Sequence, residues 1–194
     1  NELHPITDVC YDDILACSQW IGKEIPTVAQ WMKAARGGID IPDWKTPKEF
    51  VSLVRNPNPF RSYPWGDLLP NASENKDKVY RCNYCADDSF VGQGADGYMY
   101  TARVGEFSAW NSPYGCADLA GNVYEICCDH YSADYTPREG ETDPRGPLKS
   151  PEYRVKMGGG FYSLARKCMI GVVTKFNIYH GESQTGFRLI VPGK

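Results

Sequence analysis

The stretch from Asn56 to Leu119 most constrains the fold of this chain, because it is long and carries almost no regular pattern. It is rich in Gly, Asn, Asp and Pro, and few of its apolar residues recur at a helical or strand period. Such a stretch is uncommon inside a compact domain unless something holds it in place. Bound cations are a natural candidate. With 19 Gly and 14 Pro in the chain, the sequence predicts long ordered loops rather than a helical bundle.

Regular elements are predicted on both sides of this stretch. Apolar positions near helical spacing predict a helix from Asp8 to Ile21, and the capping box Thr27-Val28-Ala29-Gln30 predicts a second helix that ends at Gly37. A further capping box, Thr46-Pro47-Lys48-Glu49, predicts a short helix through Arg55. The expected fold class is α+β, with two or three helices and a small, mostly antiparallel sheet. Its predicted strands are residues 121–128, 154–157 and 187–191.

Length and charge exclude several classes of function. The 194 residues suit one domain that is large enough to build its own core. The net charge of −3 offers nothing to attract phosphate backbones or anionic lipid, so nucleic-acid partners are not expected. No apolar run approaches the length of a membrane span.

The chain has eight cysteines, but it is too large to depend on a disulfide framework, and buried, reduced thiols are the expectation. Cys82-Asn83-Tyr84-Cys85 forms a CxxC, which suits a redox pair or half of a zinc site. No second CxxC or paired His follows, so structural zinc is not expected. Cys127 and Cys128 are adjacent, and in a strand they point to opposite faces.

Five ordered motifs resemble the formylglycine-generating-enzyme (sulfatase-modifying factor) family, and the resemblance covers nearly the whole chain. It implies a loop-rich, C-type-lectin-like fold and a single domain over residues 1–194. The family's usual first strands are missing before the first helix, and residues 39–62 form an insertion. The motifs are residues 25–38 (IPTVAQWMKAARGG), 63–67 (YPWGD), 111–125 (NSPYGCADLAGNVYE), 158–161 (GGGF) and 186–189 (GFRL).

The same resemblance provides a test for enzyme chemistry. Family members use two cysteines spaced C-x4-C that hold copper(I), and soft thiolates suit this ion. Counted from the Gly158-Gly160 motif, the first cysteine falls on Cys168 and the second on Val173, which cannot ligate a metal or form a disulfide. Copper is therefore not expected, and the chain is interpreted as leaning away from catalysis, with Cys168 as the sole catalytic candidate.

The resemblance also implies two structural Ca²⁺ sites, each built from hard oxygen ligands. Such sites would pin the loop-rich middle of the chain. The alternative is that Asp96-Gly97 is a plain turn and that Asn122 and Glu125 are ordinary hydrogen-bonding residues. The first site would use the side chains of Asn83 and Asp96 with the carbonyls of Tyr84 and Tyr98, and the second the side chains of Asp118 and Glu125 with the carbonyls of Gly121 and Val123.

Residues 162–185 are the candidate variable segment for ligand binding, because their apolar and aromatic residues show no clean period. The segment resembles the mutated C-terminal region that variable proteins of diversity-generating retroelements place on the ligand face of this fold. Such a face suits a protein or cell-surface ligand, and a virion or cell-surface location. The predicted ligand-binding residues are Tyr162, Ser163, Leu164, Arg166, Met169, Ile170, Val172, Thr174, Phe176, Asn177, Ile178, Tyr179 and His180.

Three functions remain open at this point. The first is a non-enzymatic ligand-binding display protein, plausibly a variable protein of a virus or prokaryote. The second is a divergent copper-dependent oxidase that acts on a peptide cysteine through Cys168 and an unconventional second thiol. The third is a structural or adaptor domain. Solvent exposure of residues 162–185 would favour the display protein. A second cysteine sulfur within bonding reach of Cys168 would favour the oxidase.

Overall fold

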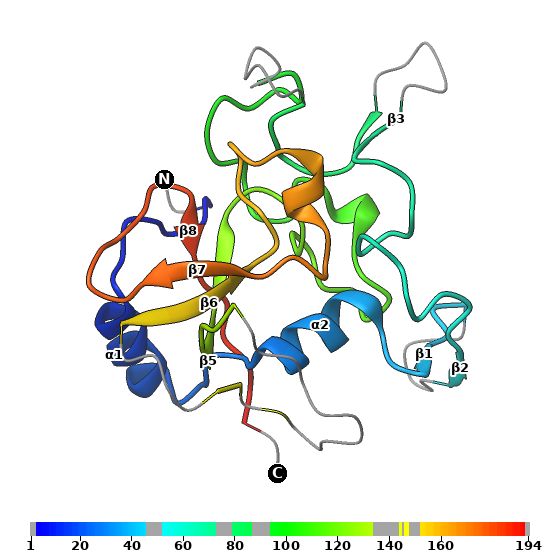
Figure 1. Cartoon of the computed structure of the whole chain (residues 1–194). Coiled ribbons are helices and arrows are strands. Elements are labelled where there is room, and N and C mark those ends of the chain that lie inside the picture. Colours follow the sequence, from blue (N-terminus) through cyan, green and yellow to red (C-terminus); the bar gives the residue numbers. More distant parts are fainter. Residues whose placement is uncertain are drawn as a thin grey trace.

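The computed structural model describes residues 3–45, 52–72, 79–86, 94–133, 144, 146–147 and 152–192 (Figure 1). Two helices and a four-stranded sheet form the ordered centre, and long connections surround them. This arrangement confirms the predicted α+β class with a small sheet. No helix in the described ranges is both long enough and apolar enough to cross a membrane.

The first helix, α1, spans Tyr11–Ile21 and begins three residues later than predicted. Asp8 has a φ of 58°, which lies in the left-handed region and does not continue into a helix. Cys10 is the N-cap instead, and its backbone N–H donates to the carboxylate of Asp13. Gly22 ends the helix in a left-handed conformation, as its position in the sequence predicts.

The second helix, α2, spans Val28–Arg36 and confirms the prediction from its capping box. The Thr27 hydroxyl accepts from the backbone N–H of Gln30, and the Gln30 side chain accepts from that of Thr27. Trp31 and Ala35 are buried on one face of this helix. The caps thus fix the start of α2, and its apolar face directs Trp31 into the core.

The central sheet has the strand order β7-β6-β5-β8. β5 (Tyr124–His130) pairs antiparallel with β6 (Tyr153–Met157), which pairs antiparallel with β7 (Thr174–Asn177). β8 (Thr185–Gly186) pairs parallel with β5. The mostly antiparallel sheet is therefore confirmed.

Alternation along β5 divides the core between the two faces of the sheet. Ile126 packs with Tyr11 and Ile14 of α1, whereas Cys127 packs with Trp31 of α2. Cys128 turns back towards the α1 cluster, so the two adjacent cysteines point to opposite faces as predicted. Each helix thus covers its own face of the sheet (Figure 1).

The predicted terminal strand over residues 187–191 is wrong in its extent. Only Thr185–Gly186 pairs with the sheet, and Ile190 makes an isolated bridge with Glu24. The chain leaves the sheet between these two contacts, where the Arg188 side chain reaches the carboxylate of Glu125. The apolar run therefore packs against α1 without extending the strand.

The predicted helix through Arg55 is also wrong where the structure describes it. Leu53–Arg55 forms strand β2, which pairs antiparallel with β1 (Asp40–Pro42). The capping box at 46–49 lies outside the described residues. The other short elements are β3 (Asn71–Ala72), β4 (Val79–Tyr80) and the 3-10 helices η1 (Ser108–Trp110) and η2 (Ala165–Cys168).

Buried polar side chains hold the loops of the 56–119 stretch. The Asn122 amide bridges both backbone groups of Ala102, and the Arg61 guanidinium donates to the carbonyls of Asn58 and Pro64 and to the side chain of Asn56. These side chains satisfy main-chain groups that regular structure leaves unpaired. At these points the described loops are therefore held by the protein's own side chains.

Candidate functional site

The candidate segment 162–185 is partly a surface and partly core. Tyr162, Arg166, Tyr179 and His180 are exposed. Leu164, Met169, Val172, Thr174, Asn177 and Ile178 are half-buried. The expectation of a fully exposed face is wrong at Ser163, Ile170 and Phe176, which are buried. Phe176 packs under α1, and Ile170 packs under α2.

Two surface depressions lie along the exposed part of this segment. The first has a volume of about 310 Å³ and is called here the Tyr100 pocket. The second, of about 510 Å³, is called here the η2 depression. The Tyr100 pocket is lined by Thr7, Asp8, Tyr100, Thr101, Phe161, Tyr162 and Ser183. The η2 depression is lined by Tyr63, Leu69, Cys85, Ala86, Leu164, Ala165, Arg166 and Met169.

The main chain between the depressions is firmly fixed. The Ser163 hydroxyl accepts from the backbone N–H of Gly160 and donates to the phenol oxygen of Tyr124. The backbone N–H of Cys85 donates to the carbonyl of Ser163. Ser163 therefore positions the surface from below, which is a different role from the predicted ligand contact.

Cys168 has a sulfur neighbour that its own segment did not reveal. It is fully buried in a cluster that also contains Cys82, and its Sγ donates to the carbonyl of Leu164 at 3.7 Å. Burial raises the pKa of the Cys82 thiol well above its ordinary value, and the contact with Cys168 raises it further. Both thiols are therefore shielded from solvent, and the raised pKa makes Cys82 a poor nucleophile.

Val173 does not share this environment. It is 40% exposed and lines an apolar cavity of about 450 Å³ with Val28, Met32 and Val155. Counting the C-x4-C spacing backwards from Cys168 instead reaches Ser163, an oxygen side chain. Neither register of the spacing supplies two thiols.

The first predicted Ca²⁺ site has features that fit a cation. Asn83 is fully buried, and its Oδ1 accepts no hydrogen bond from any residue that the structure describes. The Asp96 carboxylate accepts from the backbone N–H groups of Tyr84 and Tyr98, and its burial raises its pKa. A calcium ion would satisfy the Asn83 oxygen and favour the ionised form of Asp96.

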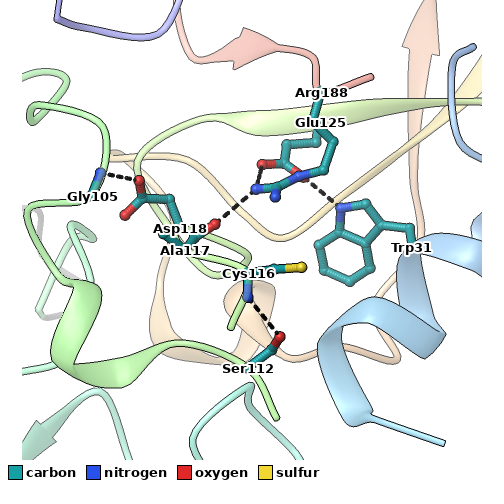
Figure 2. Close-up of polar contacts among 8 residues, drawn as sticks. All are labelled: Trp31, Gly105, Ser112, Cys116, Ala117, Asp118, Glu125 and Arg188. Carbon is teal, nitrogen blue, oxygen red and sulfur yellow. Dashed lines mark hydrogen bonds and ion pairs between the residues drawn. The ribbon is translucent and has the colours of Figure 1, made fainter. Parts of the chain in front are cut away.

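The second predicted site does not fit Ca²⁺, because the Glu125 carboxylate is already paired with the Arg188 guanidinium (Figure 2). The Arg188 guanidinium forms an ion pair with both carboxylate oxygens of Glu125, and the Trp31 Nε1–H donates to Oε2 at 2.6 Å. Burial lowers the pKa of Arg188, but the charge of Glu125 outweighs this and raises it overall. Asp118 accepts from the backbone N–H of Gly105, and burial raises its pKa.

The described residues contain no group of three or more His, Cys, Asp and Glu side chains that is arranged to hold a metal ion. A calcium site at Asn83 would therefore depend on amide and carbonyl oxygens in addition to Asp96.

Asp8, Tyr63 and Tyr100 line the depressions but were missed from the sequence. They come from remote segments, and no local pattern marks them.

Comparisons with known proteins support the family inferred from the motifs. A sequence model of the "Sulfatase-modifying factor enzyme 1-like domain" matches residues 1–192. A "Formylglycine-generating enzyme" of Thermomonospora curvata is 32% identical over 191 residues, which is 95% of this chain and 54% of the relative. The chain thus spans about half the length of this curated relative.

Two solved structures have the same fold. "Treponema denticola variable protein 1" is 25% identical with a TM-score of 0.56, and the match covers 86% of this chain and 46% of that one. PvdO from Pseudomonas aeruginosa is 21% identical with a TM-score of 0.62, over 96% of this chain and 61% of that one. Because the family model covers nearly every residue, this chain belongs to the sulfatase-modifying factor enzyme 1-like domain family.

Proposed function

We propose that this chain is a non-enzymatic ligand-binding domain. Its binding face is the surface around Tyr162 and Arg166, together with the Tyr100 pocket and the η2 depression. The observation that carries this proposal is the contrast between an open, aromatic surface and a buried thiol. Tyr100 and Tyr162 are 69% and 40% exposed, whereas Cys168 is 0% exposed.

The surface has the properties of a recognition site. Exposed tyrosines offer large rigid contact areas at low entropic cost, and Arg166 adds a planar donor at the η2 depression. The main chain beneath is held by Ser163 and by Phe161, which is buried. A face of this kind tolerates substitution of its exposed residues, since the scaffold does not depend on them.

Selection from a randomised displayed-peptide library tests this proposal. Wild-type protein is expected to enrich peptides whose binding is lost in Tyr162→Ala and Arg166→Glu. The exposed aromatic Trp20 on α1 provides a control, and Trp20→Ala is expected to bind the same peptides as wild type. The proposal would be contradicted if no peptide were enriched. It would also be contradicted if Tyr162→Ala and Arg166→Glu both bound the peptides as tightly as wild type.

Diversification of this face by a retroelement is the second part of the proposal. The similarity to a Treponema denticola variable protein supports it. The expected observation is a reverse-transcriptase gene near the coding sequence, with a near-duplicate of its 3′ end in which adenines mark the varied codons. A genomic neighbourhood with neither feature would remove this part and leave ligand binding in place.

A structural calcium ion at Asn83 and Asp96 is the third part. The buried Asn83 oxygen without a described donor supports it, and the carbonyls of Tyr84 and Tyr98 would complete the ligand set. When bound, the ion would contribute charge and coordination that fix residues 83–84 and 96–98 next to the binding face.

A copper-dependent oxidase acting on a peptide cysteine is the second candidate function. The position of Cys82 and Cys168 in one buried cluster favours it, because two neighbouring thiols are the ligands that copper(I) prefers. The burial of both sulfurs opposes it, since a substrate thiol has no access to them. Mass spectrometry of a cysteine-containing peptide, incubated with the copper-loaded protein, decides between the two functions: formation of an aldehyde would establish the oxidase.

A further inference from the structure

The Tyr100 pocket has an unusual combination of aromatic walls and a single charge. The rings of Tyr100 and Phe161 lie 5.9 Å apart at 77°, and those of Phe161 and Tyr162 lie 6.0 Å apart at 64°. Both tyrosine rings are therefore steeply inclined to the buried Phe161. The pocket is therefore lined by two tyrosines that are 69% and 40% exposed, and an exposed aromatic face attracts a cation through its negative quadrupole.

Charge in the pocket has one sign. Asp8 is the only charged side chain among the described residues that line it, and Thr7, Thr101 and Ser183 supply hydroxyl groups. The Thr7 hydroxyl donates to Asp8 Oδ2 at 3.0 Å, which holds the carboxylate at the rim. An anionic ligand would meet Asp8 with like charge, whereas a cation is attracted by both the carboxylate and the rings.

The walls of the pocket are held in place before a ligand arrives. The backbone N–H of Asp8 donates to the carbonyl of Glu182, and that of Val104 donates to the carbonyl of Leu3. Asn122 bridges the backbone of Ala102, next to Thr101. In Figure 1 the N-terminal segment runs beside the loop between β7 and β8. A preformed pocket loses little conformational entropy on binding.

We infer that the Tyr100 pocket binds an alkylammonium group, and that the lysine side chain of a protein ligand is its natural occupant. This inference rests on the proposed binding function and gives the class of group that the face selects. The Tyr100 pocket has a volume of about 310 Å³, which accommodates a substituted ammonium with its adjoining methylenes.

Binding of small probes to the purified chain tests the inference directly. Choline and its neutral isostere 3,3-dimethylbutan-1-ol have the same shape and differ in charge. Titration calorimetry, with nuclear magnetic resonance of the tyrosine rings, is expected to show choline binding roughly 5- to 30-fold more tightly than the alcohol. Equal affinity of the two probes would overturn the inference.

Variants separate the two sources of attraction. Tyr162→Phe keeps the ring and is expected to retain choline binding, whereas Tyr162→Leu removes the aromatic face and is expected to weaken it by about fivefold or more. Asp8→Asn removes the charge, and asparagine tolerates the φ of 58° at this position, so weaker binding with an unchanged fold is expected. Choline binding that is unchanged in both Tyr162→Leu and Asp8→Asn would place the probe elsewhere.

The source of the ammonium and the proposed function are tested together. N-acetyl-lysine methylamide is expected to compete with choline, and peptides selected from the library are expected to lose binding when their lysine is replaced by norleucine. Selected peptides that contain no cationic residue would overturn the inference and leave ligand binding established. Choline binding without any selected peptide would instead contradict the proposed protein ligand.

Discussion

At the residue scale, the part-buried ion pair between Arg188 and Glu125 links three distant segments. Glu125 belongs to β5, Arg188 follows β8, and Trp31 of α2 donates to the same carboxylate (Figure 2). Arg188 also donates to the carbonyl of Ala117. Removing Glu125 leaves the charge of Arg188 without its partner at a site where it is only 26% exposed, which is unfavourable.

Glu125→Gln is therefore expected to lower the free energy of unfolding by about 2 kcal/mol, measured by urea denaturation in the presence of a calcium chelator. The double variant Glu125→Gln with Arg188→Gln is expected to recover part of this loss, because it removes both charges. A loss below about 1 kcal/mol in Glu125→Gln would show that the pair contributes no more than an exposed ion pair does.

Asp67 provides a pH-dependent contribution at the residue scale. Its carboxylate accepts from the backbone N–H of Ser62 and from the side chain of Asn58, and these hydrogen bonds lower its pKa, the Ser62 bond most. A lowered pKa in the folded state means that the stabilisation is present above the unfolded-state pKa and disappears as the pH falls through the folded-state value.

Asp67→Asn is accordingly expected to lower Tm at neutral pH, with a difference from wild type that shrinks towards zero as the solution is acidified. Differential scanning fluorimetry across this range measures the effect. The exposed carboxylate of Asp40 gives a matched control, and Asp40→Asn is expected to change Tm little at any pH. A difference that grows on acidification would contradict the assigned hydrogen bonds.

At the element scale, the entry into β5 depends on a close approach between two loops. Gly121 has a φ of 73°, and a Cβ placed there would lie 2.2 Å from the backbone oxygen of Asn83. Gly22, at the end of α1, has a similar φ of 66° but no heavy atom within 4 Å of that position. A substitution at Gly22 therefore measures the cost of the backbone conformation alone, and one at Gly121 measures that cost together with a steric clash.

Gly22→Ala is expected to cost about 1 kcal/mol, which is the penalty for an alanine in the left-handed region. Gly121→Ala is expected to cost more than about 3 kcal/mol, because the loop at Asn83 must move as well. Chemical denaturation of both variants checks the difference. Equal losses would show that the two loops do not approach as closely as described.

The elements also show where local sequence signals succeed. Both helix ends at Gly22 and Gly37 and the start at Thr27 follow from capping chemistry within a few residues. The strand at Leu53–Arg55 was missed, because it forms by pairing with β1, and no pattern within either strand indicates this pairing. Pairing with a distant strand overrides local helix propensity at these positions.

At the scale of the whole molecule, calcium is expected to couple the loop-rich half to the sheet. Ca²⁺ at about 100 times its dissociation constant should add about 2.7 kcal/mol to the free energy of unfolding. Asp96→Asn is expected to abolish the rise in Tm, and Asp118→Asn to retain it, since Glu125 is paired with Arg188. Loss of the calcium effect in Asp118→Asn alone would assign the ion to the second site instead.

Only part of the candidate site could be predicted from the sequence. The sequence pointed to residues 162–185, and it is there that Tyr162 and Arg166 are exposed. It did not distinguish them from Ser163, Ile170 and Phe176, because Ser163 and Ile170 lie in irregular chain and the strand that contains Phe176 is too short, at four residues, to show a period. Asp8 and Tyr100 join Tyr162 only after the chain has folded.

The sequence by itself determined the family, the α+β class and the two capped helices, because motifs and caps depend on residues that are close along the chain. Only the tertiary structure decided that Cys168 lies against Cys82, that Glu125 is held by Arg188, and that Asp8 stands beside two tyrosines. These contacts join positions that are far apart in sequence. Their chemistry is set by burial and proximity, which exist only once the whole chain has packed.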